Sequence, residues 1–173
     1  FWGFNTNAAV LSLISSILYG FAYTPLKRIS PICNLVGAIP GALPPLIGWV
    51  SATGTLFEPT DIGGWAVFSI QFFWQFPHLW AIAWVGHEDY ERAGLKMLPS
   101  KSGKTPFTGL QCMFYSLTLL PISILCKQIG LIGDLGMWAS ILLGVFYFVA
   151  SFNFYQKNSC KMSFDMLYLY SSG

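Results

Sequence analysis

The sequence predicts an all-α, polytopic transmembrane helical bundle, and two observations carry this prediction. Of the 173 residues, 54% are hydrophobic and only 9% are charged, against about 25% charged in an average soluble domain. The charges fall in clusters separated by five charge-free runs, each longer than the roughly 20 residues that a helix needs to cross a bilayer. We therefore expect a single domain over residues 1–173 with five membrane spans, at about residues 8–26, 32–56, 63–86, 107–126 and 135–156.

Basic residues gather on one side of this predicted topology, because the loops between successive spans alternate between the two membrane faces. Eight of the nine basic residues fall on one face: Lys27, Arg28, Arg92, Lys96, Lys101, Lys104, Lys157 and Lys161. The opposite face receives Glu58, Asp61, Lys127 and Asp134. The positive-inside rule assigns the basic face to the cytoplasm or, in a mitochondrial protein, to the matrix.

The first predicted span ends in Tyr23-Thr24-Pro25-Leu26-Lys27-Arg28. Since proline disfavours helix in the residue before it, we expect a turn at Pro25. Lys27 and Arg28 would then lie at the membrane surface. They suit two roles there, a basic anchor that reaches the lipid headgroups or a site for phosphate oxygens.

The second predicted span combines small residues, such as Gly37 and Gly41, with three prolines at positions 40, 44 and 45. Small residues allow close helix packing in lipid, and prolines are tolerated where neighbouring helices satisfy the freed carbonyls. We expect a kinked, buried helix. Asn34, near its charged-face end, is either a structural polar contact or a ligand.

The third predicted span carries a polar stripe that leads to an acidic cluster. In a helix, residues 71, 75, 78, 82, 85 and 89 fall near one face, which places Gln71, Gln75, His78 and Asp89 in line. His78 and Asp89 would lie roughly 16 Å apart along the axis. The pattern predicts a deep pocket with a charged rim, in a helix bent at Pro77. A histidine that merely bonds to a neighbouring helix is the alternative.

The loop after this span mixes acids and bases, and the predicted topology places Glu88 and Asp89 on the same face as Lys27 and Arg28. Carboxylates hold Mg²⁺ best when substrate phosphates complete its coordination, so this mouth favours a phosphorylated substrate. The last two spans offer a kink at Pro121 and no evident chemistry. The four cysteines form no CxxC pair and suit structural roles, and no nucleic-acid signature occurs.

Four ordered motifs resemble one enzyme family: YTPLKRIS from Tyr23, NLVGAIPGALPPLIGW from Asn34, FWQFPHLWAIAW from Phe73 and EDYERAGLKMLP from Glu88. They are similar to the protohaem IX farnesyltransferases, or haem O synthases, a branch of the UbiA-type intramembrane prenyltransferases. The resemblance covers about residues 8–156. It implies transfer of a farnesyl group from farnesyl diphosphate to a vinyl group of haem b in a membrane cavity, with Mg²⁺ as cofactor.

The resemblance also implies residue roles. Lys27, Arg28 and Asp89 would be catalytic, with Tyr23 at the diphosphate, Tyr90 beside the acidic element and Asp89 acting on Mg²⁺ through the diphosphate. Asn34, Gln75 and His78 would line the haem and prenyl cavity. Candidate protein partners are haem A synthase or a second copy of the chain. The compact YTPLKR segment is typical of the mitochondrial branch, which predicts the mitochondrial inner membrane, with the bacterial plasma membrane as the alternative.

The family's first acidic motif would lie before Phe1, so the sequence is expected to be a fragment that lacks part of the metal site and is inactive alone. The tail also matches the family poorly, which predicts truncation at that end. Two rival functions stay open. Another UbiA-type enzyme would typically offer a second acid four residues after Asp89, where this chain has Ala93. A haem-handling or transport protein would bind haem without regard to Mg²⁺ or farnesyl diphosphate.

Overall fold

The computed structural model describes residues 5–99 and 103–171, with side chains up to residue 158, and the regular elements of this part are all helical. They are α1 (Thr6–Ile17), a π-helical segment (Leu18–Tyr23), α2 (Thr24–Ile29), α3 (Cys33–Thr53), a 3₁₀ turn (Pro59–Asp61), α4 (Ile62–Val85), α5 (His87–Arg92), α6 (Pro106–Leu117), α7 (Leu119–Gln128) and α8 (Asp134–Ser171). The predicted all-α class is confirmed.

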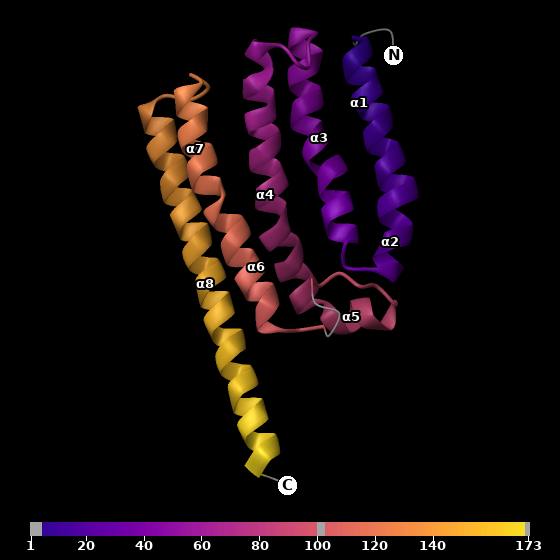
Figure 1. The fold of residues 1–173 in the computed structure, drawn as a ribbon, viewed down its shortest axis with the longest axis vertical. Coiled ribbons are helices and arrows are strands. Elements are labelled where there is room, and N and C mark those ends of the chain that lie inside the picture. The colour runs from indigo at the N-terminus through magenta and orange to yellow at the C-terminus, as the bar shows by residue number, and fades with distance from the viewer. Residues whose placement is uncertain (1–4, 100–102, 172–173) are drawn as a thin grey trace.

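Five long helical segments form the bundle, as the charge-free runs predict. Figure 1 shows them side by side as α1 with α2, α3, α4, α6 with α7, and α8, and each packs against its neighbours in that order. Four of the five are long and apolar enough to cross a membrane. The exception is α4, whose 24 residues carry no Asp, Glu, Lys or Arg. Its glutamines, histidine and tryptophans lower its mean hydropathy.

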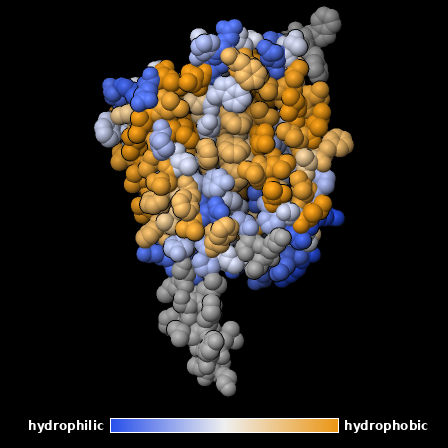
Figure 2. Space-filling model, in the orientation of Figure 1, coloured by the Kyte–Doolittle hydropathy of each residue, from blue (hydrophilic) through white to orange (hydrophobic). Residues whose placement is uncertain are grey.

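The surface matches this arrangement. Figure 2 shows a hydrophobic band across the middle of the molecule with hydrophilic residues at both ends. The α2–α3 turn and α5 lie at one end, and the α3–α4 loop and the α7–α8 turn lie at the other (Figure 1). An ion pair between Lys127 and Asp134 lies at the second end. The predicted alternation of the loops is therefore confirmed.

The turn expected at Pro25 is wrong, because the helix continues to Ile29. The π-helical segment before it shifts the hydrogen-bond ladder, so that the backbone N–H of Thr24 donates to the carbonyl of Tyr19. The Thr24 hydroxyl donates to the same carbonyl over 2.9 Å. Pro25 then falls in the first turn of α2, where a missing N–H costs little.

The proline-rich helix α3 is packed between α1 and α4, as predicted. Pro44 cannot donate to the carbonyl of Pro40, and the hydroxyl of Ser15 in α1 donates to that carbonyl over 3.4 Å. On the α4 side, a Cβ at Gly41 would overlap the side-chain amide of Gln75. The small residues therefore permit the close approach that the sequence predicts.

The two C-terminal segments differ in regularity. The helix is interrupted at Thr118, between α6 and α7 and three residues before Pro121. A proline ring clashes with the carbonyl four residues earlier, here that of Leu117, which explains the predicted break. By contrast, α8 is longer than expected and continues to Ser171, although only Asp134–Asn158 qualifies as a membrane span.

Candidate functional site at the charged face

The predicted cationic and acidic groups lie on two short helices at one end of the bundle. Helix α2 carries Lys27 and Arg28 in its last turn, and α5 carries Glu88 and Asp89 in its first turn. The two helices lie at the same end of the molecule (Figure 1). A structural basis for α5 is Gly86, which ends α4 and lets the chain turn into the next helix.

An open pocket of about 680 Å³ runs along α4 to this end. Its lining consists of His78, Ala81, Ile82, Val85, Gly86, Asp89 and Tyr90. Four of the six positions predicted to form one stripe thus line one pocket. The His78 ring is exposed and stacks on Trp74, with ring centroids 5.0 Å apart. The pocket is apolar in its middle and carries a carboxylate at its mouth.

The two glutamines of the predicted stripe lie outside the lining of that pocket. Gln75 is 7% exposed and its Nε2 donates to the carbonyl of Ala38 in α3 over 2.8 Å. Gln71 is half-buried. The stripe is broader than the pocket, and its Gln75 edge faces α3.

Asn34 and Tyr23 pack around the start of α3. Asn34 is 3% exposed, and its Nδ2 donates to the carbonyl of Met97 over 2.6 Å. Tyr23 is half-buried, and a Cβ at Gly37 would overlap its ring. The ammonium of Lys27 lies 5.0 Å from the Tyr23 ring centroid, in cation–π contact. Tyr23 therefore orients the Lys27 ammonium, although neither Lys27 nor Arg28 belongs to the lining of the pocket along α4.

The acidic side of the mouth is exposed and locally paired. The side chain of Asp89 is 84% exposed, and its Oδ1 lies 3.4 Å from Nη1 of Arg92. Glu88, at 82% exposure, lies 3.7 Å from the same guanidinium. Within the described ranges, neither Lys27 nor Arg28 pairs with a carboxylate. The cations of α2 thus have no described carboxylate partner, and Glu88 and Asp89 of α5 pair only with the exposed Arg92.

The donor set decides which metal chemistry suits the mouth. Among the described residues, no three His, Cys, Asp or Glu side chains come together as metal ligands. Two neighbouring exposed carboxylates fit a Mg²⁺ ion that takes one or two protein ligands and completes its shell with phosphate and water oxygens. They do not form a cage made of protein alone.

A second cavity, of about 530 Å³, lies on the other side of α5, and the sequence gives no signal for it. Tyr90 lines both cavities and separates them. His87 and Glu91 also line the second cavity, with Nε2 and Oε2 4.0 Å apart. The residues that complete its wall come from the chain around positions 29–31 and 94–98, so folding alone brings them together.

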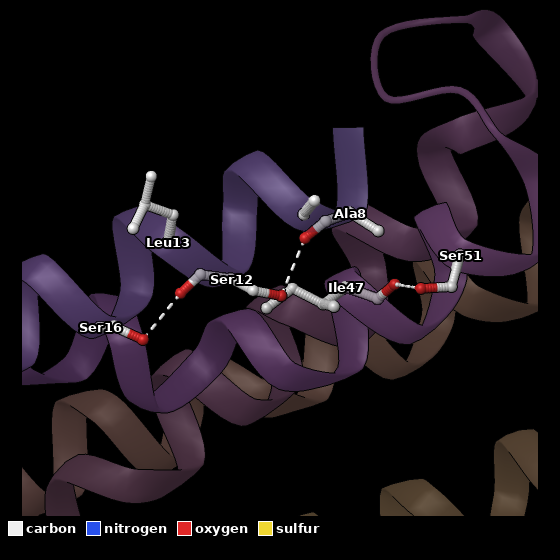
Figure 3. Close-up of a pocket in the computed structure, with 7 residues that line it drawn as sticks. Ala8, Ser12, Leu13, Ser16, Ile47 and Ser51 are labelled. Carbon is white, nitrogen blue, oxygen red and sulfur yellow. Dashed lines mark hydrogen bonds between the residues drawn. The ribbon is translucent and has the colours of Figure 1, made fainter. Parts of the chain in front are cut away.

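A groove between α1 and α3 is less suited to binding or catalysis. Figure 3 shows its serines, Ser12, Ser16 and Ser51. Each hydroxyl donates to a carbonyl one turn earlier in its own helix, at distances of 2.7–3.0 Å. The hydroxyls are therefore occupied by their own backbone. Likewise, Cys33, Cys112 and Cys126 are buried free thiols, as the sequence predicts, and the Cys160 side chain lies outside the described ones.

Asp61, in the loop at the opposite end, is a buried acid, whereas its place in the sequence indicates only a charged loop residue. Its side chain is 0% exposed. It accepts hydrogen bonds from the backbone N–H of Glu58 and the hydroxyl of Thr55, both over 2.9 Å, and from Trp49 and Thr53. Burial raises the pKa of Asp61, but these donors outweigh it and hold the pKa below its usual range. The spacing Glu58-Pro-Thr-Asp61 is a helix-start signature that could have revealed this role.

Comparison with known proteins agrees with the motifs. The family described as the UbiA prenyltransferase family matches residues 1–172. A protoheme IX farnesyltransferase of Cytophaga hutchinsonii is 42% identical over 163 residues, which cover 94% of this chain and 55% of that protein. Those of Koribacter versatilis and Flavobacterium johnsoniae are 39% and 43% identical, over 93% and 76% of this chain and 51% and 42% of their own lengths.

The chain spans about half the length of the curated relatives it matches. No solved structure matches it. The family match covers nearly the whole sequence, including both charged helices and the pocket along α4. The chain therefore belongs to the UbiA prenyltransferase family.

Proposed function

We propose that the protein transfers a farnesyl group from farnesyl diphosphate to a vinyl group of haem b, which yields haem O. The observation that carries the proposal is the open pocket along α4, which is apolar in its middle and ends at Asp89 on the face that also holds Lys27 and Arg28. An isoprenoid diphosphate has the same polarity, with an apolar chain and an anionic head. The consistent name of the relatives supports haem as the acceptor.

In this proposal, Lys27 and Arg28 bind the diphosphate. Guanidinium and ammonium groups suit phosphate oxygens, and both side chains are without a described carboxylate partner. Tyr23 holds the Lys27 ammonium by its cation–π contact and lies beside the same head group. These cations also stabilise the charge that develops on the diphosphate as it leaves.

Members of this family use Mg²⁺, and the proposed holder is Asp89, acting through the diphosphate oxygens. When bound, the metal would neutralise the charge of the leaving diphosphate. The exposed carboxylate of Asp89 carries this role, with Glu88 next to it as a further oxygen donor. Tyr90, between the two cavities, would close the pocket beside the acidic element.

The apolar wall of the pocket, Ala81, Ile82 and Val85, would exclude water from the allylic cation until the vinyl carbon attacks. His78 would contact the haem at the inner end of the pocket. Substrate contact by Asn34 and Gln75 stays a prediction. Their exposures of 3% and 7% leave them little free surface, and both donate to backbone carbonyls.

The protein is an integral membrane protein, and we propose that its charged face lies in the cytoplasm of a bacterial cell. The relatives reported above are bacterial, and they lend no support to the predicted mitochondrial branch. The basic residues of α2 and α5 support the side assigned to this face. The partners predicted from the sequence, haem A synthase or a second copy, stay predictions.

The test uses the protein expressed from its complete natural reading frame in membranes supplied with haem b, Mg²⁺ and farnesyl diphosphate. Haem O is followed by chromatography and mass spectrometry. We expect haem O from the wild type and a loss of at least about tenfold in Lys27→Ala and in Asp89→Ala. Asp134→Ala, which removes an acid of similar exposure at the opposite end, should leave the rate unchanged.

Two results would contradict the proposal in different ways. Prenylation of another aromatic acceptor, with haem b ignored, would assign a different activity within the family. Haem binding that is insensitive to Mg²⁺ and farnesyl diphosphate, without any haem O, would favour a haem-handling protein.

A further inference from the structure

A short segment after α5 returns to the beginning of α3, and we name residues 94–98 the strap. At one end, the backbone N–H of Leu95 donates to the carbonyl of Tyr90 in α5 over 2.8 Å. In its middle, the backbone N–H of Lys96 donates to the carbonyl of Lys27 in α2 over 2.7 Å. At its far end, Asn34 Nδ2 donates to the carbonyl of Met97 over 2.6 Å. The strap thus joins the acidic helix to the cationic one.

The Asn34 contact is the buried part of this connection. Asn34, Met97 and Leu98 are 3%, 8% and 4% exposed, and Met97 and Leu98 pack against Cys33 and Ala83. A carbonyl that loses its donor in such surroundings bears the full cost of desolvation. By comparison, the Lys96 ammonium donates to the carbonyl of Ile29 over 3.2 Å in an exposed position, where solvent can replace it.

Helix α5 needs an external support to hold its position. It has six residues, and an isolated helix of that length is unstable in water. Three of its charged side chains, Glu88, Asp89 and Arg92, are at least 75% exposed and pair with one another. The strap and the packing of Tyr90 therefore carry much of what fixes α5 against the α2–α3 turn.

We propose that Asn34 is a positioning residue of the prenyl-transfer site. By fixing the strap, it sets the separation between Asp89 on α5 and the cations Lys27 and Arg28 on α2, all of which bind the diphosphate in the proposed function. The functional importance of that separation rests on the proposed function. That Asn34 fixes the strap is a separate physical claim and does not depend on it. Asn34 acts through Met97 and needs no contact with substrate.

The first experiment measures local opening of the strap by trypsin in the detergent-solubilised full-length protein. Cleavage of the Lys96–Met97 bond is quantified by mass spectrometry relative to the Arg92–Ala93 bond on exposed α5. Asn34→Ala should raise the relative rate about tenfold, because opening no longer breaks the buried bond. Asn34→Leu keeps about the same size but has no donor, so it should behave in the same way.

Asn5→Ala is the matched control. The Asn5 Nδ2 also donates over 2.6 Å to a distant backbone carbonyl, that of Val50 at the opposite end of α3. Its loss tests general destabilisation without touching the strap. Equal cleavage of the Lys96–Met97 bond in Asn5→Ala and Asn34→Ala, or wild-type cleavage in Asn34→Leu, would overturn the proposal.

The second experiment measures haem O formation by the same variants in membranes. Asn34→Ala and Asn34→Leu should raise the KM for farnesyl diphosphate about tenfold and leave the KM for haem b near wild type. Asn5→Ala should alter neither constant. Equal effects on both KM values would refute a role in positioning the diphosphate site. Absence of haem O from the wild type would instead overturn the proposed function, while the trypsin comparison would still decide whether Asn34 fixes the strap.

Discussion

The acidic residues before and after α4 differ in burial and in hydrogen bonding. In the loop before α4, Asp61 is 0% exposed and takes hydrogen bonds from a backbone N–H, two threonines and a tryptophan. In the loop after α4, the side chains of Glu88 and Asp89 are more than 80% exposed, and a single arginine pairs with both. Both segments carry acidic residues in the sequence, and nothing local in it distinguishes the buried acid from the exposed ones.

This difference distinguishes an acid that stabilises the fold from acids that are exposed to a ligand. The donors around Asp61 satisfy its carboxylate fully, so it has little capacity left for a ligand. The acids of α5 have no buried donors, and Asp89 lines the pocket along α4. A carboxylate with unfilled coordination next to a pocket is the one that can bind metal-bound phosphate. The comparison predicts that mutations in the two loops affect different quantities.

The largest effect is expected at Asp89. Asp89→Asn should reduce haem O formation about 100-fold, as when one charged group that stabilises a transition state is lost. The midpoint of thermal unfolding should not change, because the side chain is 84% exposed. Asp134→Asn at the other end is the control and should alter neither quantity. A large loss of stability in Asp89→Asn would erase the distinction between the loops.

Asp61→Ala should have the reverse effect. Removing the carboxylate leaves the donors of Glu58, Thr55 and Trp49 without their acceptor. The midpoint of thermal unfolding should fall by several degrees, while haem O formed per folded molecule stays at the wild-type level. Thr60→Ala, an exposed change in the same loop, should leave the midpoint in place. Inactive but stably folded Asp61→Ala would contradict the structural role.

The acid dependence of stability sharpens the same contrast. Because the folded state holds the pKa of Asp61 below its ordinary value of 3.8, its contribution is fully present above that pH and is lost as the pH falls through the lower folded value. The difference between the thermal midpoints of wild type and Asp61→Asn, measured between about pH 2 and pH 7, should therefore stay constant above about pH 4 and narrow as the pH falls below it. A constant difference over this range would show that ionisation of Asp61 is irrelevant.

The smallest effect is expected at Arg92. Its pairs with Asp89 and Glu88 lie at the surface, where an ion pair contributes less than about 1 kcal/mol. Arg92→Ala should shift the free energy of unfolding by no more than that. Chemical denaturation in detergent at low and high salt provides the measurement. A salt-sensitive loss larger than that in Asp61→Ala would reverse the comparison.

Composition and charge predict the helical segments because both are read directly from the order of residues in the sequence. Charge-free runs predict the five long helical segments, of which four qualify as membrane spans, and the alternation of the connections predicts which loops share an end. The turn at Pro25 was predicted wrongly because a π-helical segment, which hydropathy does not reveal, places the proline harmlessly in the next helical turn. Local sequence patterns therefore predict the helices correctly and fail where the backbone hydrogen bonding changes from α-helical to π-helical.

The candidate site was predictable in part for a similar reason. Helical periodicity predicts His78 and Asp89 on one face of a single helix. The structure divides that helix at Gly86 into α4 and α5, yet both residues line one pocket. By contrast, the partners of Asn34 and Gln75 lie 63 and 37 residues away in sequence, and nothing local encodes which helix faces them. The same holds for the second cavity, whose wall combines segments on both sides of α3 and α4.

The prolines of α3 also bear on how the protein is made. Pro40, Pro44 and Pro45 interrupt the backbone ladder in the middle of a membrane helix, and the freed carbonyl of Pro40 finds its donor in Ser15 of another helix. Alone in lipid, α3 would expose unsatisfied carbonyls, each at a cost on the order of several kcal/mol. During synthesis, α3 should therefore leave the translocon together with α1 and stay packed against it. Its packing should be complete only after α4 has inserted.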